Sequence, residues 1–292
     1  MRICDKKGVL FYLISSIKNI ISQNNNDKKI YRNMPYYRSK AKKNRENKIK
    51  YQVKRKKIES DTQYEEGIFP DLQCPYTFSK EERDANGNII CMIKKDGKKE
   101  FFPKIEGLTI NFSKGNNTVI FYEGTKFKNT KMDIGYDCFV FIGETHRNIF
   151  NMYIVSTSAS STLYIDNGFS CGGGSIVFAE NKKIYIGKDC MFSNNVVIRV
   201  SDGHSIFNDK NQLINEGKDI YIGNHVWVGH GVRIEKGVYI SDNSVVGEYA
   251  VVTKKFLEKN VIIAGIPGKI IKHGITWDRR DPRAFIPQTF NK

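Results

Sequence analysis

Aliphatic residues recur at every sixth position through the second half of the chain. The longest run comprises Ile222, Val228, Ile234, Ile240, Val246 and Val252. Helices place apolar residues three to four positions apart and half-buried strands two apart, so a period of six indicates neither element. It predicts a solenoid in which each unit is one short strand and a corner. Three units then close a triangular coil around an inward column of aliphatic side chains.

The period extends toward the N-terminus and is interrupted twice. Its earlier members are Ile165, Cys171, Ile186, Phe192 and Ile198, and the interruptions are residues 201–219 and 254–260. Both could be surface insertions without a role, but an insertion in a regular solenoid is also where a site is often built. Small residues beside the aliphatic positions are expected at corners, because glycine tolerates corner dihedral angles that branched residues do not.

The flanking regions predict additions to this solenoid. Residues 107–165 keep a looser rhythm and predict wider coils, so that the solenoid spans 107–268. Residues 61–106 contain an apolar run at 89–93 before an Asp-Gly turn, which predicts a hairpin that caps the open end. Residues 269–292 are expected to form a tail that lies on the body, with Trp277 as a packing anchor. The glycines at 172–174 lack the lysine of a phosphate loop and are expected to pack closely at a corner.

Two motifs carry a resemblance to a known family. The segment Ser201–Phe207 (SDGHSIF) and the turn Ala264–Lys269 (AGIPGK) flank the regular repeats. This arrangement resembles the hexapeptide-repeat acyltransferases, which include galactoside and maltose acetyltransferases and the O-acetyltransferases of bacterial surface polysaccharides. The resemblance is strong over residues 184–272. It implies an all-β fold of the left-handed parallel β-helix type, a homotrimer and acetyl-CoA as the donor. Separately, we expect no metal.

Transfer of an acetyl group to a hydroxyl requires a base, because the alcohol is a poor nucleophile until its proton is removed. His204 matches the histidine of the family motif and is the expected base. Asp202 could hold the imidazole in the proton-accepting tautomer, or it could cap the turn before Gly203. Trp227 resembles the family tryptophan beside the active site, where its flat face can line the acceptor or pantetheine channel, and little room inside a coil favours an outward indole. A backbone N–H near Gly229 is the expected oxyanion donor.

His230 departs from the family pattern, since galactoside acetyltransferase carries a serine there. We place it in the acetyl pocket with Trp227 and Gly229. For the donor, Gly247, Ala264 and Gly265 are expected to expose backbone to the pantetheine arm. Thr253, Lys254 and Lys269 are expected to meet the phosphates.

These residues predict an O-acetyltransferase acting on a hydroxyl of a bacterial surface glycan, with an acidic sugar such as sialic acid as one acceptor. An N-acetyltransferase acting on an amino sugar and a non-catalytic β-helix used for binding or assembly are the alternatives. A zinc-dependent hydrolase would need three histidines across coils in a spacing that His204, His225 and His230 lack. The six cysteines show no paired spacing and predict reduced, partly buried thiols in a cytoplasmic protein.

Charge is concentrated at the N-terminus. The chain carries a net charge of +16. Residues 1–60 contain 18 Lys or Arg and 4 Asp or Glu, a balance of +14 that leaves +2 for the rest. Residues 9–21 also place apolar side chains at helical spacing. We expect either a solvated arm, or attraction to an anionic membrane at its inner face or to an acidic glycan; no nucleic-acid-binding module is recognisable.

A deletion separates the membrane and glycan hypotheses for residues 1–60. If the arm binds membranes, its removal abolishes binding to anionic liposomes and leaves turnover of a soluble acceptor unchanged, because the catalytic body is intact. A raised KM for a soluble acidic acceptor, together with lost salt dependence, would contradict membrane attachment and assign the arm to the acceptor.

Overall fold

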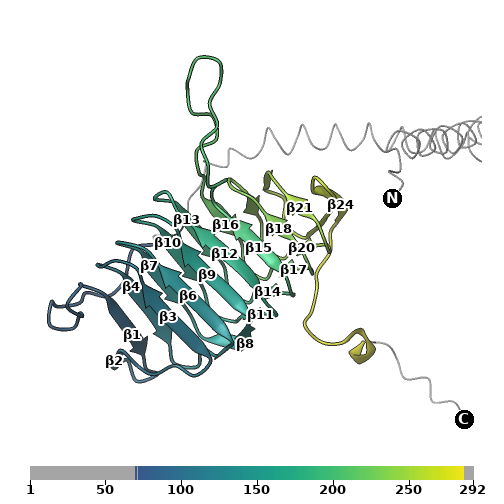
Figure 1. The fold of residues 1–292 in the computed structure, drawn as a ribbon. Coiled ribbons are helices and arrows are strands. Elements are labelled where there is room, and N and C mark those ends of the chain that lie inside the picture. Colours follow the sequence, from purple (N-terminus) through teal and green to yellow (C-terminus); the bar gives the residue numbers. More distant parts are fainter. Residues whose placement is uncertain (1–69, 71, 286–292) are drawn as a thin grey trace, which may run out of the picture. The chain divides into compact units, whose positions relative to one another are not determined.

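A computed structural model describes residue 70 and residues 72–285, and this part of the chain is a left-handed parallel β-helix (Figure 1). Three parallel sheets, here named A, B and C, form the faces of a triangular prism. The basic arm and the helix predicted at residues 9–21 lie outside the described residues. None of the helical segments within the described part of the chain is long and apolar enough to cross a membrane.

Each coil contributes one strand to sheet B, then one to sheet A, then one to sheet C, which creates B–A, A–C and C–B corners. Sheet B contains β3 (Leu108–Phe112), β6 (Thr130–Ile134), β9 (Met152–Ser156), β12 (Gly174–Phe178), β15 (Val196–Arg199), β18 (Arg233–Ile234) and β21 (Val251–Val252). Sheet A contains β1 (Ile89–Ile93), β2 (Lys99–Phe101), β4 (Thr118–Tyr122), β7 (Phe139–Ile142), β10 (Thr162–Ile165), β13 (Lys183–Ile186), β16 (Ile220–Ile222), β19 (Tyr239–Ile240) and β22 (Lys255–Phe256). Sheet C contains β5 (Phe127–Lys128), β8 (Thr145–Phe150), β11 (Phe169–Cys171), β14 (Met191–Phe192), β17 (Trp227–Val228), β20 (Val245–Val246), β23 (Val261–Ala264) and β24 (Lys269–His273). A single 3₁₀ turn, η1 (Pro282–Ala284), lies near the end of the described chain.

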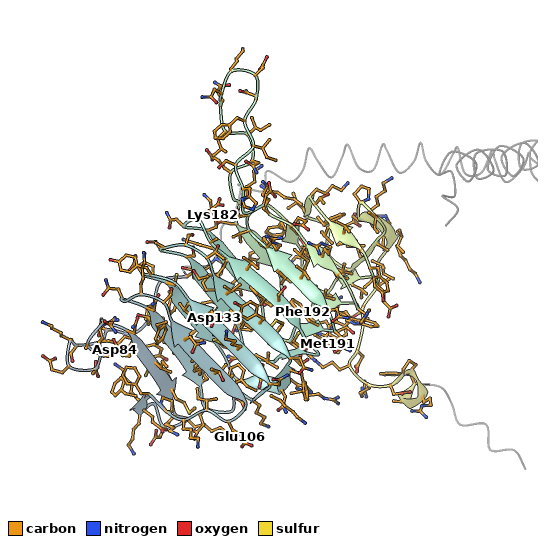
Figure 2. The ribbon with its side chains drawn as sticks, in the orientation of Figure 1. Asp84, Glu106, Asp133, Lys182, Met191 and Phe192 are labelled. Carbon is orange, nitrogen blue, oxygen red and sulfur yellow. The ribbon has the colours of Figure 1, made fainter. Side chains whose placement is uncertain are left out.

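The period of six predicts the core correctly. All six members of the longest run, from Ile222 to Val252, are fully buried. The earlier members join the same cluster, and Figure 2 labels one of them, Phe192, beside its half-buried neighbour Met191. Alternate residues of a strand face the same side of the sheet, and the residue two positions earlier is buried in the same cluster in most units, as at Val226, Val232 and Val238. The prism is therefore filled by more than the one aliphatic residue per unit that the period marks.

The expected reason for the small residues at the corners is wrong in part. Gly223 and Gly229 do not have positive φ angles; a Cβ atom there would lie 2.8 Å from a backbone nitrogen of the next coil. The left-handed conformation falls two residues later, at His225 (φ 53°) and Gly231 (φ 66°). Asparagine and aspartate fill many equivalent positions, since they tolerate this conformation better than most residues. Close approach of successive coils therefore selects these glycines.

The two interruptions of the period have different structures. Residues 201–219 replace the B–A corner after β15 and form a loop that projects far from the prism (Figure 1). The second interruption was expected to be an insertion, and that is wrong. Phe256 takes the inward position of sheet A four residues after Val252, and Ile263 follows seven residues later, so this coil is shorter than its neighbours.

The N-terminal end of sheet A is covered by a hairpin and an extended segment. Strand β1 pairs with β2 in the antiparallel direction and with β4 in the parallel direction, which confirms the predicted hairpin. Three half-buried residues of the preceding segment, Cys74, Tyr76 and Phe78, pack against buried Ile120 and Phe141 on the outer face. This second cluster covers the outer face of sheet A at the N-terminal end of the solenoid, where β2 is the edge strand.

An aromatic ladder continues along the outer face of sheet A. It consists of Phe141, Tyr164, Tyr185, Tyr221 and Tyr239, which occupy the same register on five successive strands. Successive rings are stacked at centroid distances of 4.4, 5.7, 5.0 and 4.4 Å. Burial raises the pKa of Tyr164 to about 12, and it raises the pKa values of Tyr185 and Tyr221 as well.

The ladder predicts a loss of stability at alkaline pH. The folded state favours the protonated phenols, so their contribution is complete below about pH 10, the ordinary tyrosine pKa, and is lost as pH rises through about 12. Thermal unfolding and tyrosinate absorbance measured across this range should show the ladder phenols ionising as the protein unfolds. Titration of the ladder near pH 10 in a folded protein would contradict this assignment.

Candidate functional site

The projecting loop is fastened at its neck by Glu180, which lies one coil earlier. One carboxylate oxygen accepts a hydrogen bond from the hydroxyl of Ser201, and the other accepts from the backbone N–H of Gly217 at 2.9 Å. The backbone N–H of Lys218 also donates to the carbonyl of Val200 at 2.9 Å. The two ends of the loop are therefore fixed against the prism by one side chain and one backbone bond.

Asn215 joins the two sides of the loop just above this neck. Its amide nitrogen donates to the carbonyl of His204 at 2.8 Å and to the carboxylate of Asp202 at 2.9 Å. Its amide oxygen accepts from the backbone N–H of Ile206 at 2.7 Å. One side chain thus holds three alternate positions of the segment that carries the predicted base.

The carboxylate of Asp202 is engaged by Lys236 of the next coil as well as by Asn215. These hydrogen bonds, with Lys236 first, hold the pKa of Asp202 below its usual range. The ammonium of Lys236 also donates to the carbonyl of Asn215 at 2.8 Å. No contact within residues 72–285 joins Asp202 to the imidazole of His204, so a direct role for Asp202 in orienting the ring stays a prediction.

The imidazole of His204 is exposed and makes no hydrogen bond to any residue that the structure describes. Its backbone is fixed through Asn215, while both ring nitrogens remain available. A neutral imidazole in this situation can accept a proton from a hydroxyl placed beside it.

The outer part of the loop exposes apolar side chains. A backbone bridge joins Phe207 and Leu213, so that the two sides run antiparallel. The four largest apolar residues are 42–60% exposed, namely Ile206, Phe207, Leu213 and Ile214. Exposed apolar side chains gathered on one projection are typical of a surface that contacts another molecule.

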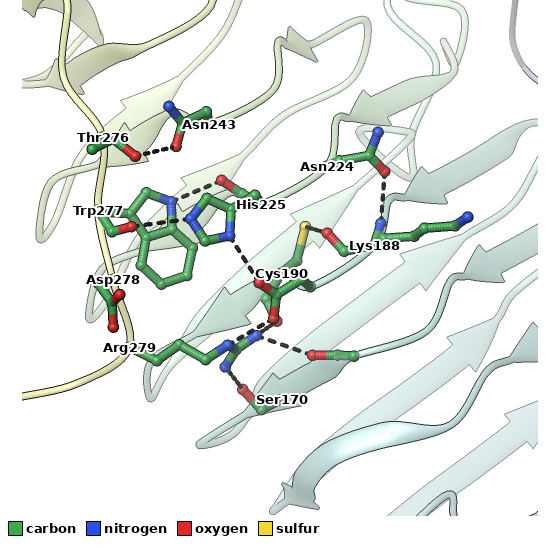
Figure 3. Close-up of polar contacts among 12 residues, drawn as sticks. Ser170, Lys188, Cys190, Asn224, His225, Asn243, Thr276, Trp277, Asp278 and Arg279 are labelled. Carbon is green, nitrogen blue, oxygen red and sulfur yellow. Dashed lines mark hydrogen bonds and ion pairs between the residues drawn. The ribbon is translucent and has the colours of Figure 1, made fainter.

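Trp227 lies on the outer face of β17, as its position in the period predicts, and is 39% exposed. The buried indole of Trp277 approaches it with 6.0 Å between ring centroids. Trp277 stacks on the imidazole of His225 at 4.1 Å, and its indole N–H donates to the carbonyl of His225 at 2.7 Å (Figure 3). Trp277 is therefore a packing anchor, as predicted.

Arg279 fixes the same tail to two lower coils (Figure 3). Its guanidinium pairs with Asp189 at 2.9 Å, donates to the hydroxyl of Ser170 at 2.7 Å, and reaches two backbone carbonyls, those of Gly168 and Cys190. Asp189 also accepts from, or pairs with, Nδ1 of His225 at 2.8 Å. The tail consequently lies along the A–C corner and borders one side of Trp227.

The C–B corner presents a column of small residues. Gly229, Gly247 and Ala264 follow one another on successive coils, and each glycine N–H donates to the coil above at 2.8 Å. The N–H of Gly229 is therefore occupied and cannot bind an oxyanion. The neighbouring N–H of His230 makes no hydrogen bond to a described residue, and the His230 ring lies edge-on to Tyr249 at 5.3 Å. A Cβ atom at Gly247 would lie 3.2 Å from that of Ala264, so the strip is narrow and flat.

The glycines at 172–174 also pack as predicted. A Cβ atom at Gly174 would meet the carbonyl oxygen of Val196 at 2.0 Å, and one at Gly172 would meet the side chain of Asn194 at 2.2 Å. This part of the chain is a tightly packed C–B corner of the coils below.

The predicted site residues fall on two sides of the prism. His204, Asp202, Thr253 and Lys254 lie at the B–A corner, whereas Trp227, Gly229, His230, Gly247, Ala264 and Gly265 lie on sheet C or its corner with sheet B. Lys269 begins β24 at the end of sheet C. The structure does not bring the two groups together within one chain. His204, His225 and His230 likewise occupy three different corners.

Sequence comparison identifies the repeats and their relatives. Residues 219–254 match the family described as bacterial transferase hexapeptide (six repeats). A polysialic acid O-acetyltransferase of Neisseria meningitidis is 42% identical over 171 residues, covering 57% of this chain and 78% of that protein. A second polysialic acid O-acetyltransferase, from Escherichia coli O1:K1 / APEC, is 33% identical over 134 residues, which cover 46% of this chain and 43% of that protein.

Comparison with solved structures identifies a similar protein. The crystal structure of the polysialic acid O-acetyltransferase OatWY has a TM-score of 0.51 and 36% sequence identity to this chain. The alignment covers 60% of this chain and 89% of OatWY.

Proposed function

This chain belongs to the hexapeptide-repeat acyltransferase family, and on that premise we propose that it is an O-acetyltransferase that moves an acetyl group from acetyl-CoA to a hydroxyl group of a sialic acid polymer. The observation that carries the proposal is the state of His204, whose backbone is fixed by Asn215 while its ring is unengaged. The relatives named above act on hydroxyl groups, which favours an O-acetyltransferase over the N-acetyltransferase alternative.

In this mechanism His204 acts as the general base. Its neutral imidazole removes the proton of the acceptor hydroxyl, and the oxygen attacks the thioester carbonyl of acetyl-CoA. A backbone N–H beside Gly229, that of His230, stabilises the oxyanion of the tetrahedral intermediate. Collapse of the intermediate expels the CoA thiolate, which takes the proton back from the imidazolium. The acetyl group passes directly to the acceptor, with no covalent enzyme intermediate.

The strip of Gly229, Gly247 and Ala264 is the proposed path of the pantetheine arm. Gly247 and Ala264 are half-buried, and with buried Gly229 they leave a strip without large side chains, along which an extended chain could lie close to the backbone. Gly265 follows Ala264 in the chain, and Lys269 pairs with Ala264 across strands β23 and β24, so we assign the ammonium of Lys269 to the phosphates as a point charge. Thr253 and Lys254 lie at the other corner, so in this proposal they would reach the donor only from a neighbouring chain.

Replacement of His204 tests the central step. We expect His204→Ala to lower kcat by a factor of about 10²–10⁴, because the hydroxyl loses its proton acceptor, with the Kd for acetyl-CoA unchanged. His146→Ala is the matched control, since His146 is exposed on β8 and distant in sequence from the loop. The measurement is steady-state acetyl transfer to polysialic acid. Activity of His204→Ala within a few-fold of the parent would remove His204 from the role of base.

We further propose a homotrimer in which each site takes the loop of one chain and sheet C of its neighbour. The separation of His204 from Trp227 and Gly229 on different sides of the prism supports this arrangement. The exposed apolar side chains of the loop supply the contact between chains, because burial against a neighbouring chain removes their apolar surface from water, which is favourable.

Light scattering tests the assembly. The parent should have three times the mass of one chain, and Ile206→Ser combined with Phe207→Ser should shift the protein toward monomers and remove activity while circular dichroism is retained. Ile271→Ser is the control, as Ile271 is 64% exposed outside the loop. A monomeric parent with full activity would refute the shared site.

A further inference from the structure

One cation beneath the His204 turn has no partner. Arg199 is the last residue of β15 and lies directly before the projecting loop. Its Nε atom is buried and makes no hydrogen bond, and none of the hydrogen bonds or ion pairs between residues 72 and 285 includes its guanidinium. Arginine stays charged at any ordinary pH, and buried polar groups without partners are rare enough to require an explanation.

The guanidinium of Arg199 lies against the turn that carries the base. A Cβ atom at Gly203 would lie 3.7 Å from Nη2 of Arg199. Since Gly203 has no side chain, the turn leaves this face of the guanidinium uncovered. Arg199 therefore lies close to the backbone of the segment Asp202–His204.

The neighbouring charges do not neutralise Arg199. The carboxylate of Asp202 is bound by Lys236 and Asn215, and Arg199 is the weakest of the influences that lower its pKa. Glu180 is occupied by the neck of the loop. Arg233, on the adjacent strand, pairs with Glu235 at 3.3 Å. Unlike Lys236 and Arg233, Arg199 therefore has donors that are committed to no described residue.

We infer that Arg199 binds the carboxylate of the acceptor sugar that His204 deprotonates. The inference rests on the proposed function, because it requires a sialic acid unit in the site. The planar guanidinium presents two parallel N–H groups that match a carboxylate, and a half-buried position strengthens the pairing by excluding water. With the carboxylate held here, the hydroxyl groups of the same sugar lie within reach of the neighbouring His204. A phosphate of the donor is the other anion that this fork could bind, and the experiment separates the two sources.

Direct binding provides a test that is independent of turnover. Saturation-transfer NMR with a sialic acid oligomer, without acetyl-CoA, should show binding to the parent and at least about tenfold weaker binding to Arg199→Gln. The parent should bind the carboxyl methyl ester of the oligomer as weakly as Arg199→Gln binds the unmodified oligomer. Arg199→Gln should bind the ester and the unmodified oligomer with the same affinity, as expected when the guanidinium and the carboxylate act as a pair. Arg233→Gln is the matched control and should bind like the parent. Circular dichroism and thermal unfolding establish that each variant is folded.

Kinetics then locate the effect. Arg199→Gln should raise KM for the acceptor by about tenfold or more and leave the Kd for acetyl-CoA unchanged, with partial recovery in Arg199→Lys. A change confined to acetyl-CoA binding would assign Arg199 to a donor phosphate and overturn the inference, and so would equal oligomer binding by the parent and Arg199→Gln or no binding by the parent. Binding that depends on Arg199 without any acetyl transfer would refute the proposed function and leave Arg199 as a residue that binds the carboxylate of a sialic acid unit.

Discussion

The backbone hydrogen bonds between successive coils are the constraint on which the rest of this structure depends. Each strand inside a sheet pairs with a strand on either side, in most cases one coil above and one coil below, so every coil must return the chain to the same register. The aliphatic residue at each inward position fills the prism only when this register is kept. A long insertion can be accommodated only by leaving the prism, and residues 201–219 do so at the B–A corner. The candidate base is consequently presented on a loop whose attachment points are rigid.

The periodic part of the fold could be predicted from the sequence because its cause is local. A repeated spacing of six specifies the inward column from Ile222 to Val252, and those side chains are buried as expected. The second interruption could not be read correctly, since Phe256 fills an inward position four residues after Val252 and breaks the spacing without breaking the coil. The corner glycines were located correctly but explained wrongly. Their selection depends on contact with the next coil, which becomes evident only in three dimensions.

The sequence suggests members of the candidate site but does not give their geometry. The motif around His204 and the outward position of Trp227 follow from sequence, but their placement at different sides of the prism follows from which sheet each unit joins. No sequence pattern identified the residues that hold the loop, which are Glu180, Asn215 and Lys236. Their partners are distant in sequence, and an isolated glutamate, asparagine or lysine near a polar insertion resembles any solvated residue. Arg199 was missed for the same reason, because a missing partner can be recognised only when the surroundings are known.

The contact between the tail and the A–C corner also determines what can be observed in solution. Trp227 and Trp277 are the two tryptophans of the sequence, and their rings lie 6.0 Å apart. Both indoles therefore report on a single place, where the tail meets sheet C. Tryptophan fluorescence, excited at wavelengths that tyrosine does not absorb, is therefore a local signal from one side of the proposed donor site, obtained without any added label.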